Sequence, residues 1–166
     1  MPKITRYLFF SMLILLFLNG CGSIGDENVN SSEDIFQYKE SMIGDNSAVA
    51  SIIRQLKHNE EFQEVSLDTK EKPYGMTLKY GNIDVAEIEK EYKETAINNA
   101  TCLFALINNA EWVTFDFEDN KYKITKSKLQ DFYSKDLSGF SNEKELKALV
   151  QEQLKDESKV NQLFTR

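Results

Sequence analysis

Hydrophobic and polar residues change their spacing several times along the chain, and each change marks a predicted element. Residues 44–59, "GDNSAVASIIRQLKHN", carry apolar side chains at helical spacing, with Asp45 or Asn46 as the N-cap. Two short runs of strand character follow, "FQEVSLDT" and "YGMTLKYG", and Pro73 and Gly75 lie around the turn between them. This stretch therefore predicts a helix followed by a β-hairpin.

The longest helical pattern spans residues 82–110, "NIDVAEIEKEYKETAINNATCLFALINNA". Asp84 and Glu87, three positions apart, form a pair typical of a capping box. The apolar stripe consists of Val85, Ile88, Tyr92, Ala96, Ala100, Phe104 and Ile107. The second half of the segment is apolar nearly all round, so we expect it to be the most deeply buried element.

A second hairpin is predicted over residues 111–127, "EWVTFDFEDNKYKITKS", with Asp119 and Asn120 as its two-residue turn. In this register apolar residues pair with each other on one face of the hairpin, and polar or oppositely charged residues pair on the other. The register pairs Phe117 with Tyr122, Phe115 with Ile124, Asp116 with Lys123 and Thr114 with Thr125.

The C-terminal part is predicted to be helical. "SKLQDFYSKDL", residues 127–137, indicates a short helix, and residues 142–164 indicate one amphipathic helix with Asn142 and Glu145 as its capping pair. The order α-β-β-α-β-β-α-α predicts an α+β fold. We expect an antiparallel four-stranded sheet of two hairpins, each preceded by a helix, with helices on one face and further helices at the C-terminus.

The first 20 residues have the pattern of a signal peptide. Lys3 and Arg6 precede the apolar run 7–18, which only Ser11 interrupts. Twelve residues suit the hydrophobic region of a signal peptide, whereas a transmembrane helix needs roughly 20.

"LNGC", Leu18 to Cys21, resembles the lipobox of bacterial lipoproteins, although Asn19 departs from the usual small residue. The resemblance implies cleavage between Gly20 and Cys21 and a covalent diacylglycerol on the Cys21 thiol. Two acyl chains anchor a protein stably to a membrane. The alternatives are an ordinary cleaved secretory signal and a disulfide between Cys21 and Cys102, although Cys102 lies in an apolar stretch that favours simple burial.

These observations divide the chain into three parts. Residues 1–20 are the predicted signal peptide, residues 21–34 the lipidated cysteine and a flexible tether, and residues 35–166 a single globular α+β domain. The expected location is the extracytoplasmic side of the cell membrane.

Net charge and residue types make certain partners and sites unexpected. The formal net charge is −7 and no stripe of Lys or Arg stands out, so nucleic acid is not an expected partner. The single histidine, His58, follows the first predicted helix, where a cation is favoured by the helix dipole. One histidine and one apolar-flanked cysteine assemble no ordinary zinc site, and no metal or cofactor is expected.

Two regions are candidate binding surfaces. Trp112 falls on the same hairpin face as Thr114 and Asp116, so it is either an outward contact point or covered by the C-terminal helix. The loop "YKESMIGDNS" leads into the first helix, where free N–H groups can hold an anion unless a capping side chain uses them. Its candidate residues are Tyr38, Lys39, Gly44, Asp45, Asn46 and Ser47.

No G-x-S-x-G, P-loop or G-x-G-x-x-G pattern occurs in the chain. Asp116, Glu118 and Asp119 would be the carboxylates for an acid/base pair, but their place opposite Lys123 and at a hairpin tip favours a solvated face instead. Catalysis is therefore not the leading expectation.

From Phe36 onward the chain resembles a family of domains numbered four-eight-two-five in the DUF series, which occur in envelope lipoproteins of low-GC Gram-positive bacteria. The residues that carry the resemblance are "FQYK", "IGDNSAV", "YGMTLKY", "LFALI" and "ITKSKLQDFYSKDL". The resemblance implies an envelope context and no particular activity. We therefore expect a lipid-anchored binding, sensory or accessory domain that contacts an envelope protein or peptide. The alternatives are a small accessory enzyme that uses carboxylates, and a structural or sporulation-related lipoprotein.

Overall fold

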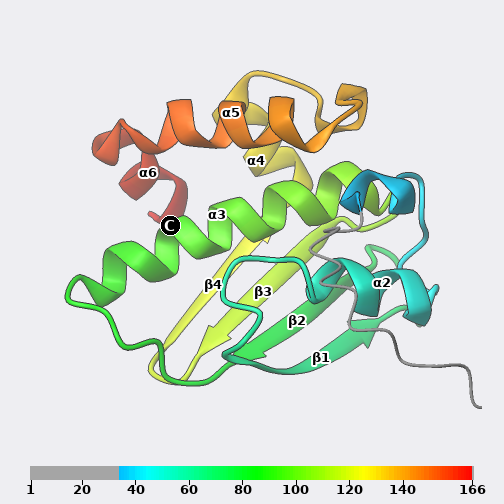
Figure 1. Ribbon diagram of the computed structural model, residues 1–166, viewed down its shortest axis with the longest axis horizontal. Coiled ribbons are helices and arrows are strands. Elements are labelled where there is room, and N and C mark those ends of the chain that lie inside the picture. Colours follow the sequence, from blue (N-terminus) through cyan, green and yellow to red (C-terminus); the bar gives the residue numbers. More distant parts are fainter. Residues whose placement is uncertain (1–33, 166) are drawn as a thin grey trace, which may run out of the picture. The chain divides into compact units, whose positions relative to one another are not determined.

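The computed structural model describes residues 34–165 (Figure 1), so the predicted signal peptide, Cys21 and most of the predicted tether lie outside the described residues. Asp34, the last residue of that tether, caps the first described element, because its Oδ1 accepts a 3.0 Å hydrogen bond from the Phe36 N–H. The elements are η2 (Ile35–Tyr38), α2 (Asn46–Ile53), β1 (Phe62–Asp68), β2 (Gly75–Tyr80), α3 (Ile88–Leu106), β3 (Trp112–Phe117), β4 (Asn120–Thr125), α4 (Lys126–Tyr133), η3 (Leu137–Gly139), α5 (Glu143–Leu154) and α6 (Glu157–Phe164).

The fold is α+β, and its four strands follow the order β1-β2-β3-β4 in one sheet. The two predicted hairpins are present, since β1 pairs with β2 and β3 pairs with β4 in antiparallel fashion. The prediction of a wholly antiparallel sheet is wrong, because β2 and β3 pair in parallel. A parallel pair needs a long crossover, and α3 supplies it between these two strands.

One face of the sheet packs against α3 to form the core. From Asn99 to Leu106 every residue of this helix is buried, as its apolar pattern predicted, and Cys102 is a buried free cysteine there. Aromatic rings join the helix to the sheet: the Tyr92 and Phe117 centroids are 4.3 Å apart with their planes nearly parallel. In Figure 1, α5 lies on the other side of α3 from the sheet, so α3 forms the middle layer.

The long helix begins later than predicted. Its first residue is Ile88, and its N-cap Glu87 makes no side-chain capping hydrogen bond, so the capping box at Asp84 is wrong. Val85 was placed in the apolar stripe, but it is one of the exposed large hydrophobic residues. The residues before Ile88 therefore connect β2 to the helix rather than extend it.

The second hairpin turns at Glu118 and Asp119, one residue earlier than predicted. Phe117 pairs with Asn120, and Glu118 adopts a positive φ of 22°. The partner of each β3 residue is therefore shifted by two positions, so that Thr114 faces Lys123 and Asp116 faces Lys121. A shift of two keeps every side chain on its predicted face, because side chains in a strand alternate with a period of two.

The C-terminal segment forms two helices, α5 and α6, where one continuous helix was predicted. The Asn142 cap is confirmed, since its Oδ1 accepts a 2.9 Å hydrogen bond from the Glu145 N–H. A second cap, Asp156, accepts from the Lys159 N–H and starts α6 after α5 has ended at Leu154. Of the described helices, none is long and apolar enough to cross a membrane.

Two buried threonines on α3 provide a matched test of the core. The Thr101 hydroxyl donates to the Ile97 carbonyl at 2.6 Å and lies 2.7 Å from the Tyr133 hydroxyl, whereas the Thr95 hydroxyl is buried without a partner. A buried polar group without a partner carries an uncompensated desolvation cost. We expect Thr95→Val to raise the free energy of unfolding by about 1 kcal/mol and Thr101→Val to lower it by about 1–2 kcal/mol in urea titrations. Equal shifts in the two variants would contradict this account.

Candidate functional site

Within residues 34–165, no helix covers the face of the sheet opposite α3, and we call this surface the open face. Residues of β3 alternate between buried and half-buried, and Trp112, Thr114 and Asp116 are the half-buried ones. The structure therefore places these three predicted residues side by side on one surface, and the C-terminal helix does not cover Trp112. Their role in binding stays a prediction.

Strand pairing arranges the open face in rows that run across all four strands. In the charged row, Glu64 pairs with Lys79, Lys79 with Asp116, and Asp116 with Lys121. The Lys121 ammonium lies 2.8 Å from Asp116 Oδ2, and its side chain is 68% exposed. Acidic and basic residues thus alternate along the row from β1 to β4.

The neighbouring row is rich in hydroxyl groups. It runs from Ser66 through Thr77 and Thr114 to Lys123 at the β4 end. These side chains are short, apart from the lysine, so the middle of the open face is flat and offers hydrogen-bond donors and acceptors. A flat surface of this kind is available to another macromolecule rather than to a small enclosed ligand.

Trp112 is held in a fixed position at the end of the open face. Its indole N–H donates a 2.9 Å hydrogen bond to the Pro73 carbonyl, and its ring lies directly against Gly75. The Lys123 ammonium lies over the ring, 4.3 Å from its centroid, in a cation–π contact. The aromatic ring is therefore preorganised rather than free to rotate.

Gly75 and Lys123 were not among the predicted site residues. A Cβ at Gly75 would lie 2.2 Å from two ring atoms of Trp112, so glycine is required for this close approach. A glycine inside a strand is a known signal for close approach of another group. The predicted hairpin register had placed Lys123 opposite Asp116, which hid its position next to the indole.

The predicted anion site at the start of α2 is occupied by a cap. Asp45 Oδ1 accepts hydrogen bonds from the N–H groups of Ser47 at 3.1 Å and Ala48 at 3.0 Å. Asp45 is the N-cap, Asn46 is the first helical residue, and Gly44 precedes both. The carboxylate therefore uses the donors that an anion would need.

The remaining loop candidates lie apart from the open face. The Lys39 ammonium donates a 2.7 Å hydrogen bond to the carbonyl of Phe140, just before α5, and Tyr38 packs against the core with its side chain partly buried. Lys39 is thus directed toward the segment before α5. Trp112, Thr114 and Asp116 are the predicted residues that share the open face.

His58 is not a helix cap, because α2 ends at Ile53. The residue adopts a left-handed conformation with φ of 60°, and each ring nitrogen faces a carboxylate. Nδ1 lies 3.2 Å from Glu61 Oε2 and Nε2 lies 2.7 Å from Glu91 Oε1, while the Lys57 ammonium is also 2.7 Å from Glu91 Oε1. The cluster ties the segment after α2 to the first half of α3.

We expect the contribution of the Glu91 carboxylate to the stability of the protein to depend on pH. Burial raises its pKa, but hydrogen bonds from Lys57 and His58 outweigh that effect and hold the pKa below the usual 4.5. A lowered folded-state pKa contributes stability above the unfolded-state value, and that contribution is lost as the pH falls through the folded-state value. We therefore expect Glu91→Gln to destabilise the protein near neutral pH and to flatten the loss of stability from about pH 5 to about pH 3.

The measurement is urea unfolding across that pH range, with Glu94→Gln as the control on the same helix. Glu94→Gln makes the same change on α3 and leaves the contacts of Glu91 with Lys57 and His58 in place. A Glu91→Gln profile parallel to that of the wild type would show that this carboxylate does not titrate differently in the folded state.

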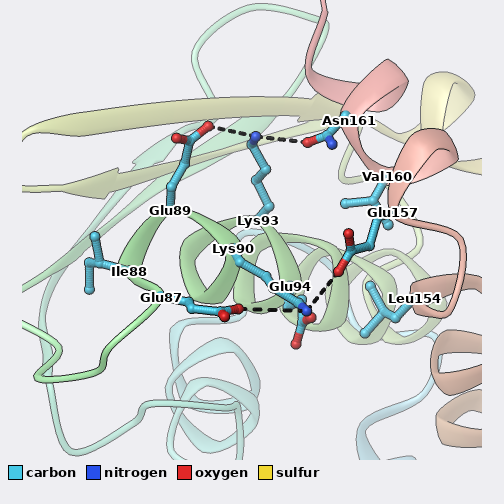
Figure 2. A pocket seen from close by; sticks show the side chains of 10 residues that line it. All are labelled: Glu87, Ile88, Glu89, Lys90, Lys93, Glu94, Leu154, Glu157, Val160 and Asn161. Carbon is cyan, nitrogen blue, oxygen red and sulfur yellow. Dashed lines mark hydrogen bonds and ion pairs between the residues drawn. The ribbon is translucent and has the colours of Figure 1, made fainter.

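A groove lies between the start of α3 and the C-terminal helices (Figure 2). Its volume is about 720 Å³. It is lined by Glu87, Ile88, Glu89, Lys90, Lys93, Glu94, Leu154, Glu157, Val160 and Asn161. Figure 2 shows that its lysines point toward carboxylates of the groove itself.

These contacts hold α6 against α3. The Lys90 ammonium lies 2.8 Å from Glu157 Oε1, and Lys93 bridges Glu89 at 2.6 Å and Asn161 at 2.9 Å. Two close, buried acids would favour the accessory-enzyme alternative, whereas the Glu89 and Glu157 side chains of this groove are each 70% exposed. Within residues 34–165, no group of three or more His, Cys, Asp or Glu side chains is placed to hold a metal ion. The open face is thus the stronger candidate site.

Residues 34–165 form an α+β domain with a mixed four-stranded sheet, and the helices of this part of the chain cover one face of the sheet and leave the other open. The chain belongs to the family described as a domain of unknown function (DUF4825), whose model matches residues 35–127. The match extends from η2 through β4 and includes Trp112, Asp116 and Lys123 of the open face. Neither the curated proteins nor the solved structures contain a match to this chain.

Proposed function

We propose that this protein is a lipid-anchored binding module on the extracytoplasmic side of the cell membrane, with the open sheet face as its interaction surface. The observation that carries the proposal is the fixed position of Trp112 on the open face. Gly75, Pro73 and Lys123 hold the ring there. Tryptophan is enriched at the centres of protein interfaces, and a preorganised side chain loses less entropy on binding.

The surface around Trp112 supports binding rather than chemistry. Alternating charges and short hydroxyl side chains provide polar contacts next to a large aromatic ring. Interfaces commonly combine such an anchor with a polar surrounding. The expected partner is therefore a macromolecule that lies flat on the sheet.

The proposal of a lipid anchor is based on the predicted signal peptide and the lipobox at its end. "LNGC" places Cys21 where lipoproteins are modified, and two acyl chains suffice for stable attachment. We expect Cys21→Ser to move the protein out of the membrane fraction and to remove the diacylglyceryl mass from its N-terminal peptide. Cys102→Ala, which alters the other cysteine, is the control and should remain membrane-bound. Equal membrane attachment of Cys21→Ser would rule out the anchor.

The interaction surface is tested by photo-crosslinking on the full anchored chain in its own membranes. A benzoylphenylalanine at Ser66 reports on the open face, and one at Gln151, an exposed residue of α5, reports on the helical side. We expect adducts from Ser66 that Trp112→Ala reduces at least about fivefold, and few adducts from Gln151. Adducts that are equal at both positions, or that persist in Trp112→Ala, would contradict the proposal.

A further inference from the structure

We infer that the partner on the open face is a second copy of the same chain, so that two open faces meet in a symmetric dimer. This inference rests on the proposed function, since it names the occupant of the surface proposed there. It is carried by the order of charges across the sheet.

The charged row reads acidic, basic, acidic, basic from β1 to β4. Its members are Glu64, Lys79, Asp116 and Lys121, one from each strand and each paired with the next. Neighbouring strands are roughly 4.8 Å apart, so the charges form an evenly spaced line across the face. The order of signs is antisymmetric about the middle of the row, between β2 and β3.

We place the two open faces against each other, with a twofold axis between them that runs parallel to the strands and passes over the middle of the row. This axis reverses the order of the row in the second copy. Glu64 then faces Lys121 of the second copy, and Lys79 faces Asp116 of the second copy. The same two contacts repeat on the other side of the axis, because a twofold interface is self-complementary. All four positions of the row therefore meet a charge of opposite sign.

The neighbouring row allows the two faces to approach. The same axis places Thr77 opposite Thr114 of the second copy, and both are half-buried, short side chains. Two facing hydroxyl groups can serve each other as donor and acceptor. No bulky side chain in the middle of this row therefore holds the sheets apart.

Net charge also favours this face over the rest of the surface. The chain carries a formal charge of −7, so most approaches of two copies are repulsive. The open face combines three acidic residues, Glu64, Asp68 and Asp116, with three lysines, Lys79, Lys121 and Lys123, and is formally neutral. Attachment of both copies to one membrane would further raise their effective concentration.

The test exchanges the charges of one facing pair. Two differently tagged full-length copies are co-expressed, extracted in detergent and purified through one tag. Lys79→Glu in both copies places two acids opposite each other, and Asp116→Lys in both places two bases opposite each other. We expect each homotypic pair to copurify at least about tenfold less than the wild type.

The decisive sample combines Lys79→Glu in one copy with Asp116→Lys in the other. Unlike charges face each other again at every position of the row, so copurification should return to near the wild-type level. This recovery cannot come from a variant that fails to fold. The control Lys147→Glu changes the same charge on α5 and should copurify normally.

Homotypic variants that copurify like the wild type, or a mixed pair that does not recover, would overturn the dimer. The mass of the crosslinked adduct from Ser66 separates the two proposals. An adduct of twice the chain mass supports the dimer, whereas a Trp112-dependent adduct of another mass overturns the dimer and leaves the proposed function in place. The absence of any adduct from Ser66 would overturn both.

Discussion

Replacing Asn99 with alanine is expected to lower the free energy of unfolding by about 3 kcal/mol, because it leaves several buried polar groups without partners. Asn99 is fully buried on α3, where its Oδ1 accepts a 3.0 Å hydrogen bond from the Lys57 N–H. Its Nδ2 donates to the Lys57 carbonyl at 2.9 Å and to the Tyr80 hydroxyl at 3.1 Å. One side chain thus joins the segment after α2, the helix α3 and the strand β2.

The neighbouring residue provides the control. Asn98→Ala makes the same change one position earlier on α3, where the side chain is half-buried, and should alter stability by less than about 0.5 kcal/mol. Tyr80→Phe removes only one member of the network and should cost about 1 kcal/mol. Urea unfolding followed by circular dichroism measures all three variants. Equal stability of the Asn99 and Asn98 variants would contradict a structural role for the network.

Replacing Gly75 with alanine is expected to cost at least about 2 kcal/mol and to displace the indole of Trp112. The added Cβ would lie 2.2 Å from the ring and 2.5 Å from the Trp112 backbone oxygen, so both the side chain and the strand must move. A displaced ring loses its hydrogen bond to Pro73 and its contact with Lys123. The ring then becomes more exposed to water.

The chain contains a single tryptophan, so its intrinsic fluorescence reports on this position alone. We expect the emission of Gly75→Ala to shift to longer wavelength, together with a lower urea midpoint. Gly44→Ala is the matched control, because a Cβ at Gly44 meets nothing within 4 Å. A Gly75→Ala variant with unchanged emission and stability would show that the indole does not lie against this glycine.

Alternation of apolar residues predicted the faces of the strands better than their partners. It separated Trp112, Thr114 and Asp116 from the core side of β3, and the structure agrees. It contains no information on strand direction, so the parallel pairing of β2 and β3 did not follow from it. A hairpin slip of two residues preserves the same faces, and the pattern therefore fits the predicted and the observed registers equally well.

Local sequence patterns did not predict the contacts between segments that are distant in the sequence. His58 looked like a helix cap because it follows an apolar helical stretch, yet its partner Glu91 lies on another helix. Gly75 looked like a turn residue because it follows Pro73, yet its role is to accommodate Trp112. In both cases the local sequence identified a special residue, while the group that it contacts was determined by the tertiary fold.

The parallel pairing of β2 and β3 also has a consequence for the order of folding. Each hairpin joins strands that are close in sequence, whereas Gly75 and Trp112 become partners only after α3 has crossed between them. Closing a longer loop costs more entropy before any contact compensates for it, so the hairpins should form first and this central pairing last. Until then the chain consists of two half-sheets with unpaired inner edges. Docking of α3 is thus the step that joins them into one cooperative unit.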